Sequence, residues 1–158
     1  MYDITKKKIV WFYQFINNTM LTEKDYCDYD TCVALKELEY KVPTSAYYMP
    51  NNNKLIFVSN PCRGGYVIDC FRSHNSFPKD VMTSNYIDAP TMWEAQKWLR
   101  EKKLLHIVID KLLYGAYEFS VVDILNYSEE KNGTANSYEE ALSEGIKEAV
   151  KILKDKTN

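Results

Sequence analysis

The chain has 158 residues, of which 46% are hydrophobic and 27% are charged, and its formal net charge is −2. A chain of this length can bury a core without a metal or a disulfide, so one soluble domain is expected over residues 1–158, with an apolar N-terminal element at 1–24 and a main body at 25–158. The charge balance argues against nucleic-acid binding, because proteins that neutralise phosphates carry a basic surface.

An apolar block, Ile9–Ile16, lies near the start of the chain behind three lysines. It is apolar on every side and shows no periodicity, but its β-branched and aromatic residues slightly favour a strand over a helix. The block is too short to span a bilayer, so no membrane association is expected. It must be covered by the core or by another subunit, which makes it a candidate contact of a homo-oligomer.

Four cysteines, Cys27, Cys32, Cys62 and Cys70, form no C-x-x-C pair and have no histidine at ligand spacing. We therefore expect neither a metal site nor a cofactor. Without a secretory signal, the expectation is a cytoplasmic protein whose thiols are reduced.

The first part of the main body predicts a helix followed by a hairpin. In "DYDTCVALKELEY", Asp28 is a plausible N-cap and an apolar face repeats at helical spacing, formed by Thr31, Ala34, Leu35 and Leu38. The runs "SAYYM" and "KLIFVS" flank the turn-forming "PNNN", which is typical of a hairpin. "GYVIDCF" predicts a further strand, and residues 72–88 are polar and irregular.

Two later segments begin with the same pattern, Ser/Thr-x-x-Glu-Ala. Thr91 with Glu94, and Ser137 with Glu140, predict two capping boxes, in which the cap hydroxyl and the glutamate satisfy backbone amides at a helix start. Both helices continue with an apolar stripe, formed by Ala95, Trp98 and Leu99 in the first and by Leu142, Ile146, Ala149, Val150 and Leu153 in the second.

Between these helices, "LLHIVIDKLL" and "YEFSVVDIL" are β-rich runs separated at Tyr114-Gly115-Ala116, which predicts a second hairpin. The order helix, hairpin, helix, hairpin, helix indicates an α+β fold with about three helices packed on antiparallel sheet, possibly as two similar helix–hairpin halves. A helix–strands–helix order also occurs in double-stranded-RNA-binding domains. The segment "SEEKNGTANSYEEALSEG" is net acidic where RNA phosphates would dock, which argues against RNA binding.

The segments "YDTCVALKELEYKVPTSAYY", "APTMWEAQKWLREKK" and "SYEEALSEGIKEAVKIL" together resemble a family of small uncharacterised proteins encoded by phages, prophages and mobile elements of gut anaerobic bacteria. The resemblance covers roughly residues 28–153 and brings no known activity or catalytic residues. It implies an accessory gene product acting in a bacterial cytoplasm, and a role in countering host defence would fit that context.

The most suggestive polar segment is "NPCRGGYVIDCFRSHN". Gly64 and Gly65 would let the backbone approach a ligand, and Arg63 could form a bidentate contact to a phosphate or carboxylate. Arg72 and His74 lie at the other end of the predicted strand. These five residues are the candidate ligand site, although a plain turn with surface arginines explains them more simply.

The usual catalytic motifs are absent: there is no Walker loop, G-x-S-x-G, H-E-x-x-H or dinucleotide-binding glycine pattern. His106 heads an apolar strand, where a structural, hydrogen-bonded imidazole is the favoured interpretation. The 13 tyrosines suit a contact surface. We therefore expect a non-catalytic protein that binds a host protein or a small anionic ligand such as a nucleotide signal. The alternatives are a small hydrolase using Arg63, Arg72 and His74 on a nucleotide or nucleic acid, and a structural or assembly protein.

Overall fold

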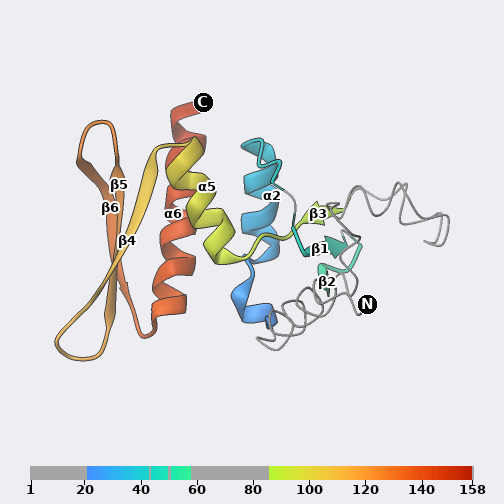
Figure 1. The fold of residues 1–158 in the computed structure, drawn as a ribbon, viewed down its shortest axis with the longest axis horizontal. Coiled ribbons are helices and arrows are strands. Elements are labelled where there is room, and N and C mark those ends of the chain that lie inside the picture. The colour runs from blue at the N-terminus through green and yellow to red at the C-terminus, as the bar shows by residue number, and fades with distance from the viewer. Residues whose placement is uncertain (1–20, 43, 50, 58–85, 158) are drawn as a thin grey trace, which may run out of the picture.

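The computed structural model of the chain describes residues 21–42, 44–49, 51–57 and 86–157. Within these ranges the chain forms three α-helices and two three-stranded antiparallel sheets, so the fold is α+β, as predicted (Figure 1). The elements in order are the 3-10 helix η1 (Glu23–Asp25), α2 (Tyr29–Glu37), β1 (Ala46–Met49), β2 (Lys54–Phe57), β3 (Ile87–Asp88), α5 (Met92–Lys102), β4 (Leu105–Lys111), β5 (Tyr117–Asp123), β6 (Ser128–Ala135) and α6 (Tyr138–Thr157).

Both ends of helix α2 are capped by hydrogen bonds between residues that are close in the sequence. At its start the predicted cap is confirmed: Asp28 Oδ1 accepts a hydrogen bond from the Thr31 amide at 2.8 Å. At its end the amides of Glu39 and Tyr40 donate to the carbonyls of Lys36 and Leu35, which is the Schellman arrangement. The predicted apolar face of this helix is buried.

The first sheet has the strand order β2-β1-β3. The predicted hairpin is confirmed, with Tyr48 opposite Leu55 and a turn in which Asn53 adopts a positive φ of 51°. Strand β3, by contrast, was not predicted, because residues 72–88 carry no apolar alternation. It is only two residues long and pairs Ile87 with Tyr48. The strand predicted from "GYVIDCF" lies outside the described residues.

The second sheet is a meander with the order β4-β5-β6. The predicted β4–β5 hairpin is confirmed, with Ile107 opposite Val121. Strand β6 was not predicted, because the sequence "SEEKNGTA" was assigned only to an acidic junction before the last helix. It pairs along β5, with an irregularity in register at Val121 and Val122.

The first predicted capping box is confirmed, whereas the second forms only one of its two reciprocal bonds. In α5, the Thr91 amide donates to Glu94 Oε2 at 2.8 Å and the Glu94 amide donates to Thr91 Oγ1 at 3.3 Å. In α6, the Glu140 amide donates to Ser137 Oγ at 3.1 Å, whereas the Glu140 carboxylate accepts from the amide of Asn136 instead of that of Ser137. The glutamate thus satisfies the amide one residue before the cap.

The helices lie between the two sheets (Figure 1). Helices α5 and α6 cover one face of the β4-β5-β6 sheet, and α2 packs between α6 and β3. One hydrophobic cluster runs through these layers and includes Leu35, Leu99, Ile107, Phe119 and Ile146. Because apolar residues of both sheets and all three described helices share this cluster, the described residues form one core and not two.

The two halves resemble each other only in part. Each begins with a helix and contains an antiparallel hairpin, but the central strand is the first strand of the hairpin in one sheet and the second in the other. The second half, 92–157, has the order helix, three strands, helix.

Candidate functional site

The five residues of the predicted ligand site, Arg63, Gly64, Gly65, Arg72 and His74, lie outside the described residues, as does the apolar block Ile9–Ile16. These predictions therefore stay predictions. Among the described residues, two other places gather polar or exposed side chains in a way that bears on function. One is a buried junction between the sheets, and the other is one end of the β4–β5 hairpin.

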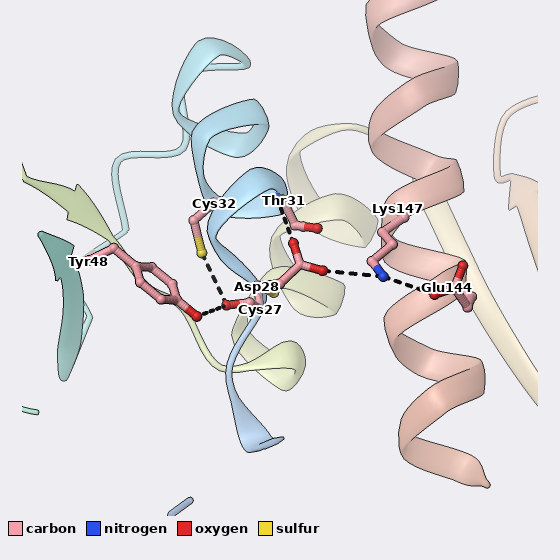
Figure 2. A network of polar contacts seen from close by, with 7 residues as sticks. All are labelled: Cys27, Asp28, Thr31, Cys32, Tyr48, Glu144 and Lys147. Atoms are coloured by element: carbon pink, nitrogen blue, oxygen red, sulfur yellow. Dashed lines mark hydrogen bonds and ion pairs between the residues drawn. The ribbon is translucent and has the colours of Figure 1, made fainter. Parts of the chain in front are cut away.

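The junction is centred on Cys27, in the segment that precedes α2 (Figure 2). The Cys27 carbonyl accepts hydrogen bonds from the Tyr48 hydroxyl at 3.0 Å and from Cys32 Sγ at 3.4 Å. The Cys27 amide donates to the Pro90 carbonyl at 3.0 Å. The backbone of one residue thus connects α2, strand β1 and the segment leading into α5.

Next to it, Asp28 joins α2 to α6. Asp28 Oδ2 lies 3.2 Å from Lys147 Nζ, which also lies 2.9 Å from Glu144 Oε1 (Figure 2). Desolvation by burial would raise the pKa of Asp28, but the hydrogen bonds from Thr31 and Lys147 outweigh it and lower the pKa below its ordinary value. The carboxylate is therefore ionised whenever the chain is folded near neutral pH.

The two thiols of this junction are poorly suited to nucleophilic chemistry. Burial raises the pKa of both the Cys27 and the Cys32 thiol, so neither forms the thiolate that nucleophilic or redox chemistry needs. Burial also raises the pKa of Tyr48 to about 12. Cys27 and Cys32 are free thiols.

His106 and Tyr40 depart from full hydrogen-bond satisfaction. A hydrogen-bonded imidazole was predicted for His106, but its Nδ1 is buried and has no hydrogen-bond partner among the described residues. The Tyr40 hydroxyl is likewise buried and has no partner among them. Such groups are rare in folded chains because an unpaired polar atom loses its hydration without compensation. His106 heads β4, opposite Val122.

The tip of the β4–β5 hairpin is exposed and apolar. The Gly115 amide donates to the Leu112 carbonyl at 3.1 Å, and Gly115 has a φ of 84°, so the three-residue loop is a tight turn closed by a left-handed residue. Leu113 and Tyr114 occupy its two central positions and are 97% and 98% exposed. A tight, hydrogen-bonded turn therefore holds two large apolar side chains in solvent, at positions where polar residues are usual.

Aromatic side chains lie behind this tip, at the end of the sheet where both α5 and α6 begin. Trp93 stacks on Tyr138 with ring centroids 5.6 Å apart, and Tyr117 meets Tyr138 edge to face at 6.1 Å. Trp93 is 51% exposed. We call Trp93, Leu113, Tyr114, Tyr117 and Tyr138 the hairpin-end surface.

The opposite end of the same sheet also exposes apolar residues, but without aromatic stacking among the described residues. In the β5–β6 turn, Leu125 is 68% and Tyr127 is 88% exposed. Asp123 Oδ1 accepts hydrogen bonds from the amides of Leu125 and Asn126 and thereby shapes the turn. This second turn offers a matched comparison for experiments on the first.

The turn was predicted at Tyr114-Gly115-Ala116, with Leu113 still in a strand, and the hairpin-end surface was not predicted. The available signal was the pair of large apolar residues directly before the turn glycine in "LLYGAY". Trp93 carried a weaker signal, since it directly follows the first helical residue and falls off the buried stripe of α5.

No protein-family model matches the chain, and no characterised protein or solved structure is significantly similar to it. Among the described residues, no helix has both the length and the apolar composition that crossing a membrane requires. The described ranges also contain no cluster of three or more histidine, cysteine or acidic side chains that could hold a metal ion.

Proposed function

We propose that the chain is a non-catalytic binding protein whose partner is another protein, and that the partner docks on the hairpin-end surface. The observation that carries the proposal is the near-complete exposure of Leu113 and Tyr114 in a turn with a fixed backbone. Exposed apolar side chains gathered in one place mark contact surfaces more often than single scattered ones do.

Covering this surface yields a large gain in binding free energy from a small number of residues. Burying a large apolar side chain contributes about 1.5–3 kcal/mol, and a rigid turn loses little conformational entropy when it docks. Tyrosine and tryptophan are also the side chains that most often dominate binding energy at protein interfaces, because they combine a large apolar body with a polar tip.

Charge supports a protein partner over a nucleic acid. The order of elements in 92–157 matches that of a double-stranded-RNA-binding domain, in which the start of the last helix contacts phosphates. Here that helix start carries Glu139 and Glu140. A phosphate backbone would be repelled where an RNA-binding domain needs lysine.

The finer parts of the proposal do not rest on the hairpin-end surface. A host protein as the partner, and a role in phage or mobile-element carriage, rest on the sequence resemblance alone. Binding of a small anionic ligand, and the alternative of a small hydrolase, rest on Arg63, Arg72 and His74.

The test replaces the two tip residues by turn-forming polar ones, Leu113→Ser with Tyr114→Asn, and compares this variant with Leu125→Ser/Tyr127→Asn at the opposite end of the sheet. Each tagged protein is expressed in host cells, co-purifying proteins are quantified, and the identified partner is titrated in purified form. We expect the tip variant to lose at least about tenfold in affinity, and the opposite-end variant to bind as the unmodified chain does.

Both variants should unfold at the same denaturant concentration as the unmodified chain or higher, since the replaced side chains are exposed. Full binding by the tip variant, or loss of binding only in the opposite-end variant, would refute the assigned surface. If no partner is captured by the unmodified chain, the proposed class of function fails.

A further inference from the structure

The β4-β5-β6 sheet has two edge strands, β4 and β6, which differ in how far they are protected against pairing with another chain. Strand β6 carries the exposed charges Glu129, Glu130 and Lys131 along its length, and its pairing with β5 contains an irregularity. Charged residues and bulges are the usual means by which sheet edges avoid association.

Strand β4 is less protected, because its charged residues, Asp110 and Lys111, stand only at its C-terminal end. It pairs with β5 in unbroken register over seven residues, and it reads Leu-His-Ile-Val-Ile before its first charge at Asp110. An edge strand that is long, regular and apolar is a template for a further strand. The two edges of this sheet therefore differ in the property that decides whether another strand can be added.

The hydrogen bonds show which backbone groups of β4 face outward. The Ile124 amide donates to the Leu104 carbonyl and the Leu112 amide donates to the Ala116 carbonyl, so the even-numbered residues face β5. Gln96 Nε2 donates to the Ile107 carbonyl at 3.0 Å from outside the sheet. The odd-numbered residues thus face the free edge, and among the described residues Gln96 is the only recorded partner of their outward groups.

Side-chain charge selects one antiparallel register for a second copy of the same strand. Asp110 lies directly opposite Glu118 on the face away from the helices, and neither carboxylate forms an ion pair with any described residue. Like charges directly opposite each other destabilise a sheet. On the same face lies His106, whose imidazole has an N–H that can donate a hydrogen bond. A register that pairs Ile107 with Ile109 of the other copy places each His106 against Asp110 of that copy.

We propose that β4 pairs antiparallel with β4 of a second copy of the chain, in the register that sets Ile107 opposite Ile109 and His106 opposite Asp110. Shifting this register by two residues in either direction places Asp110 opposite Val108 or Leu104 of the other copy. Neither of these side chains offers the carboxylate a hydrogen-bond donor. The His106–Asp110 pairs are non-hydrogen-bonded pairs of the ladder, whose side chains approach most closely. The two sheets become one six-stranded sheet.

In this arrangement the Ile109 amide of the second copy replaces Gln96 as the donor to the Ile107 carbonyl. Gln96 is half-buried on α5 and keeps that carbonyl satisfied in the single chain. An interface made by one strand edge is small, so we expect an association that depends on protein concentration, unlike that of an obligate dimer.

The test is a side-chain-swap cycle on the full chain, followed by sedimentation velocity over a range of concentrations. His106→Asp sets Asp against Asp, and Asp110→His sets His against His, so each single variant should weaken association by about tenfold or more. The double variant His106→Asp/Asp110→His restores an unlike pair in the same register, and it should associate within about threefold of the unmodified chain.

Amide hydrogen exchange gives a second readout with an internal control. The amides of Ile107 and Ile109 face the free edge and should become protected as the concentration rises, whereas those of Val108 and Asp110 face β5 and should be protected at every concentration. In both single variants the concentration-dependent protection of Ile107 and Ile109 should disappear, while the thermal unfolding of the dilute protein shows that each variant is folded.

Three results would overturn the proposal. A chain that stays monomeric at the highest concentration has no such interface. A dimer that the single variants leave unchanged uses another surface, for which Ile9–Ile16 is the candidate. Weakening by the single variants without recovery in the double variant excludes this register. None of these outcomes bears on the hairpin-end surface, whose residues are not altered.

Discussion

Glu39 shows a residue held in a conformation that its side chain disfavours. It lies directly after the cap of α2 with a φ of 67°, in the left-handed position of the Schellman arrangement that glycine usually occupies. Among the residues that the structure describes, its carboxylate pairs only with Lys41, at 3.4 Å and in an exposed position. Exposed pairs of this kind contribute little, so the backbone strain is not offset by the side chain.

Replacing Glu39 by glycine should therefore stabilise the chain. We expect the free energy of unfolding to rise by about 0.5–1 kcal/mol, because glycine adopts a positive φ without steric cost. Urea denaturation followed by circular dichroism measures the change. Glu39→Ala is the control, since it removes the ion pair and keeps the strain, and it should leave stability nearly unchanged. Equal stabilisation by both variants would show that charge and not φ is responsible.

At the residue scale the sequence predicted polar groups that act locally and missed those whose role depends on distant neighbours. Asp28, Thr91 and Ser137 were all identified as helix caps, because a cap acts on the backbone within three residues of itself. The partner of Asp28 on α6 was not predictable, since Lys147 lies far along the chain and only the packing of α2 against α6 brings it to 3.2 Å.

At the element scale, Gly145 determines how closely α6 crosses the second sheet. It lies in the interior of the helix, where glycine is unfavourable, yet it is buried. A Cβ atom at this position would lie 2.7 Å from Cγ2 of Ile107 and 3.5 Å from the Phe119 ring. The helix can approach β4 and β5 to this distance only because the side chain is missing.

Two effects of opposite sign therefore compete in Gly145→Ala. Alanine favours the helix by about 1 kcal/mol, whereas overpacking a close contact costs about 1–3 kcal/mol. Because Ile107 is itself fully buried and cannot move aside, we expect the clash to prevail and the free energy of unfolding to fall by about 1 kcal/mol or more. Thermal and urea unfolding would measure it.

Ser143→Ala provides the matched control on the same helix, since it changes propensity without a recorded contact to the sheet. It should raise the stability by about 0.5 kcal/mol. If Gly145→Ala stabilises the chain as much as or more than Ser143→Ala does, the helix is not held against the sheet by this contact.

Elements with a buried stripe were predictable, and strands β3 and β6, which lack one, were not. Helices α2, α5 and α6 and the two hairpins each show the apolar spacing of one buried face. Strand β6 shows none, because part of its covered face is filled by its neighbour: a Cβ atom on Gly133 would lie 2.7 Å from the Phe119 ring. An aromatic ring on β5 thus takes the place of a side chain on β6 and removes the alternation by which strands are recognised.

At the scale of the whole molecule, the two sheets are connected through one short segment and the helices around it. The backbone of Cys27 forms hydrogen bonds with the Tyr48 hydroxyl of the first sheet and with the Pro90 carbonyl before α5. Asp28 forms an ion pair with Lys147 on α6, the helix that covers the second sheet. Lys154 on α6 adds a second ion pair to α2, at 2.6 Å from Glu37. With a shared apolar core as well, both sheets should unfold in a single cooperative transition.

The charge on Asp28 makes this connection dependent on pH. Its pKa is lower in the folded chain than in the unfolded chain, so on acidification the unfolded state takes up the proton first. The stabilisation is therefore complete above the unfolded pKa of about 3.9 and is lost as the pH falls through the folded pKa. Asp28→Asn keeps a good cap but removes the charge, and it should cost less than about 1 kcal/mol at pH 7.

The difference in stability between the unmodified chain and Asp28→Asn should shrink below pH 4 and vanish once the carboxyl is protonated in both states. Asp28→Ala loses the cap as well and should cost about 1–2 kcal/mol at pH 7. Urea denaturation at a series of pH values gives these differences. Since Asp28 acts on both the start of α2 and the α2–α6 contact, both sheets should lose stability together. A transition that separates the two sheets, or a difference that persists undiminished in acid, would show that this carboxylate does not join them.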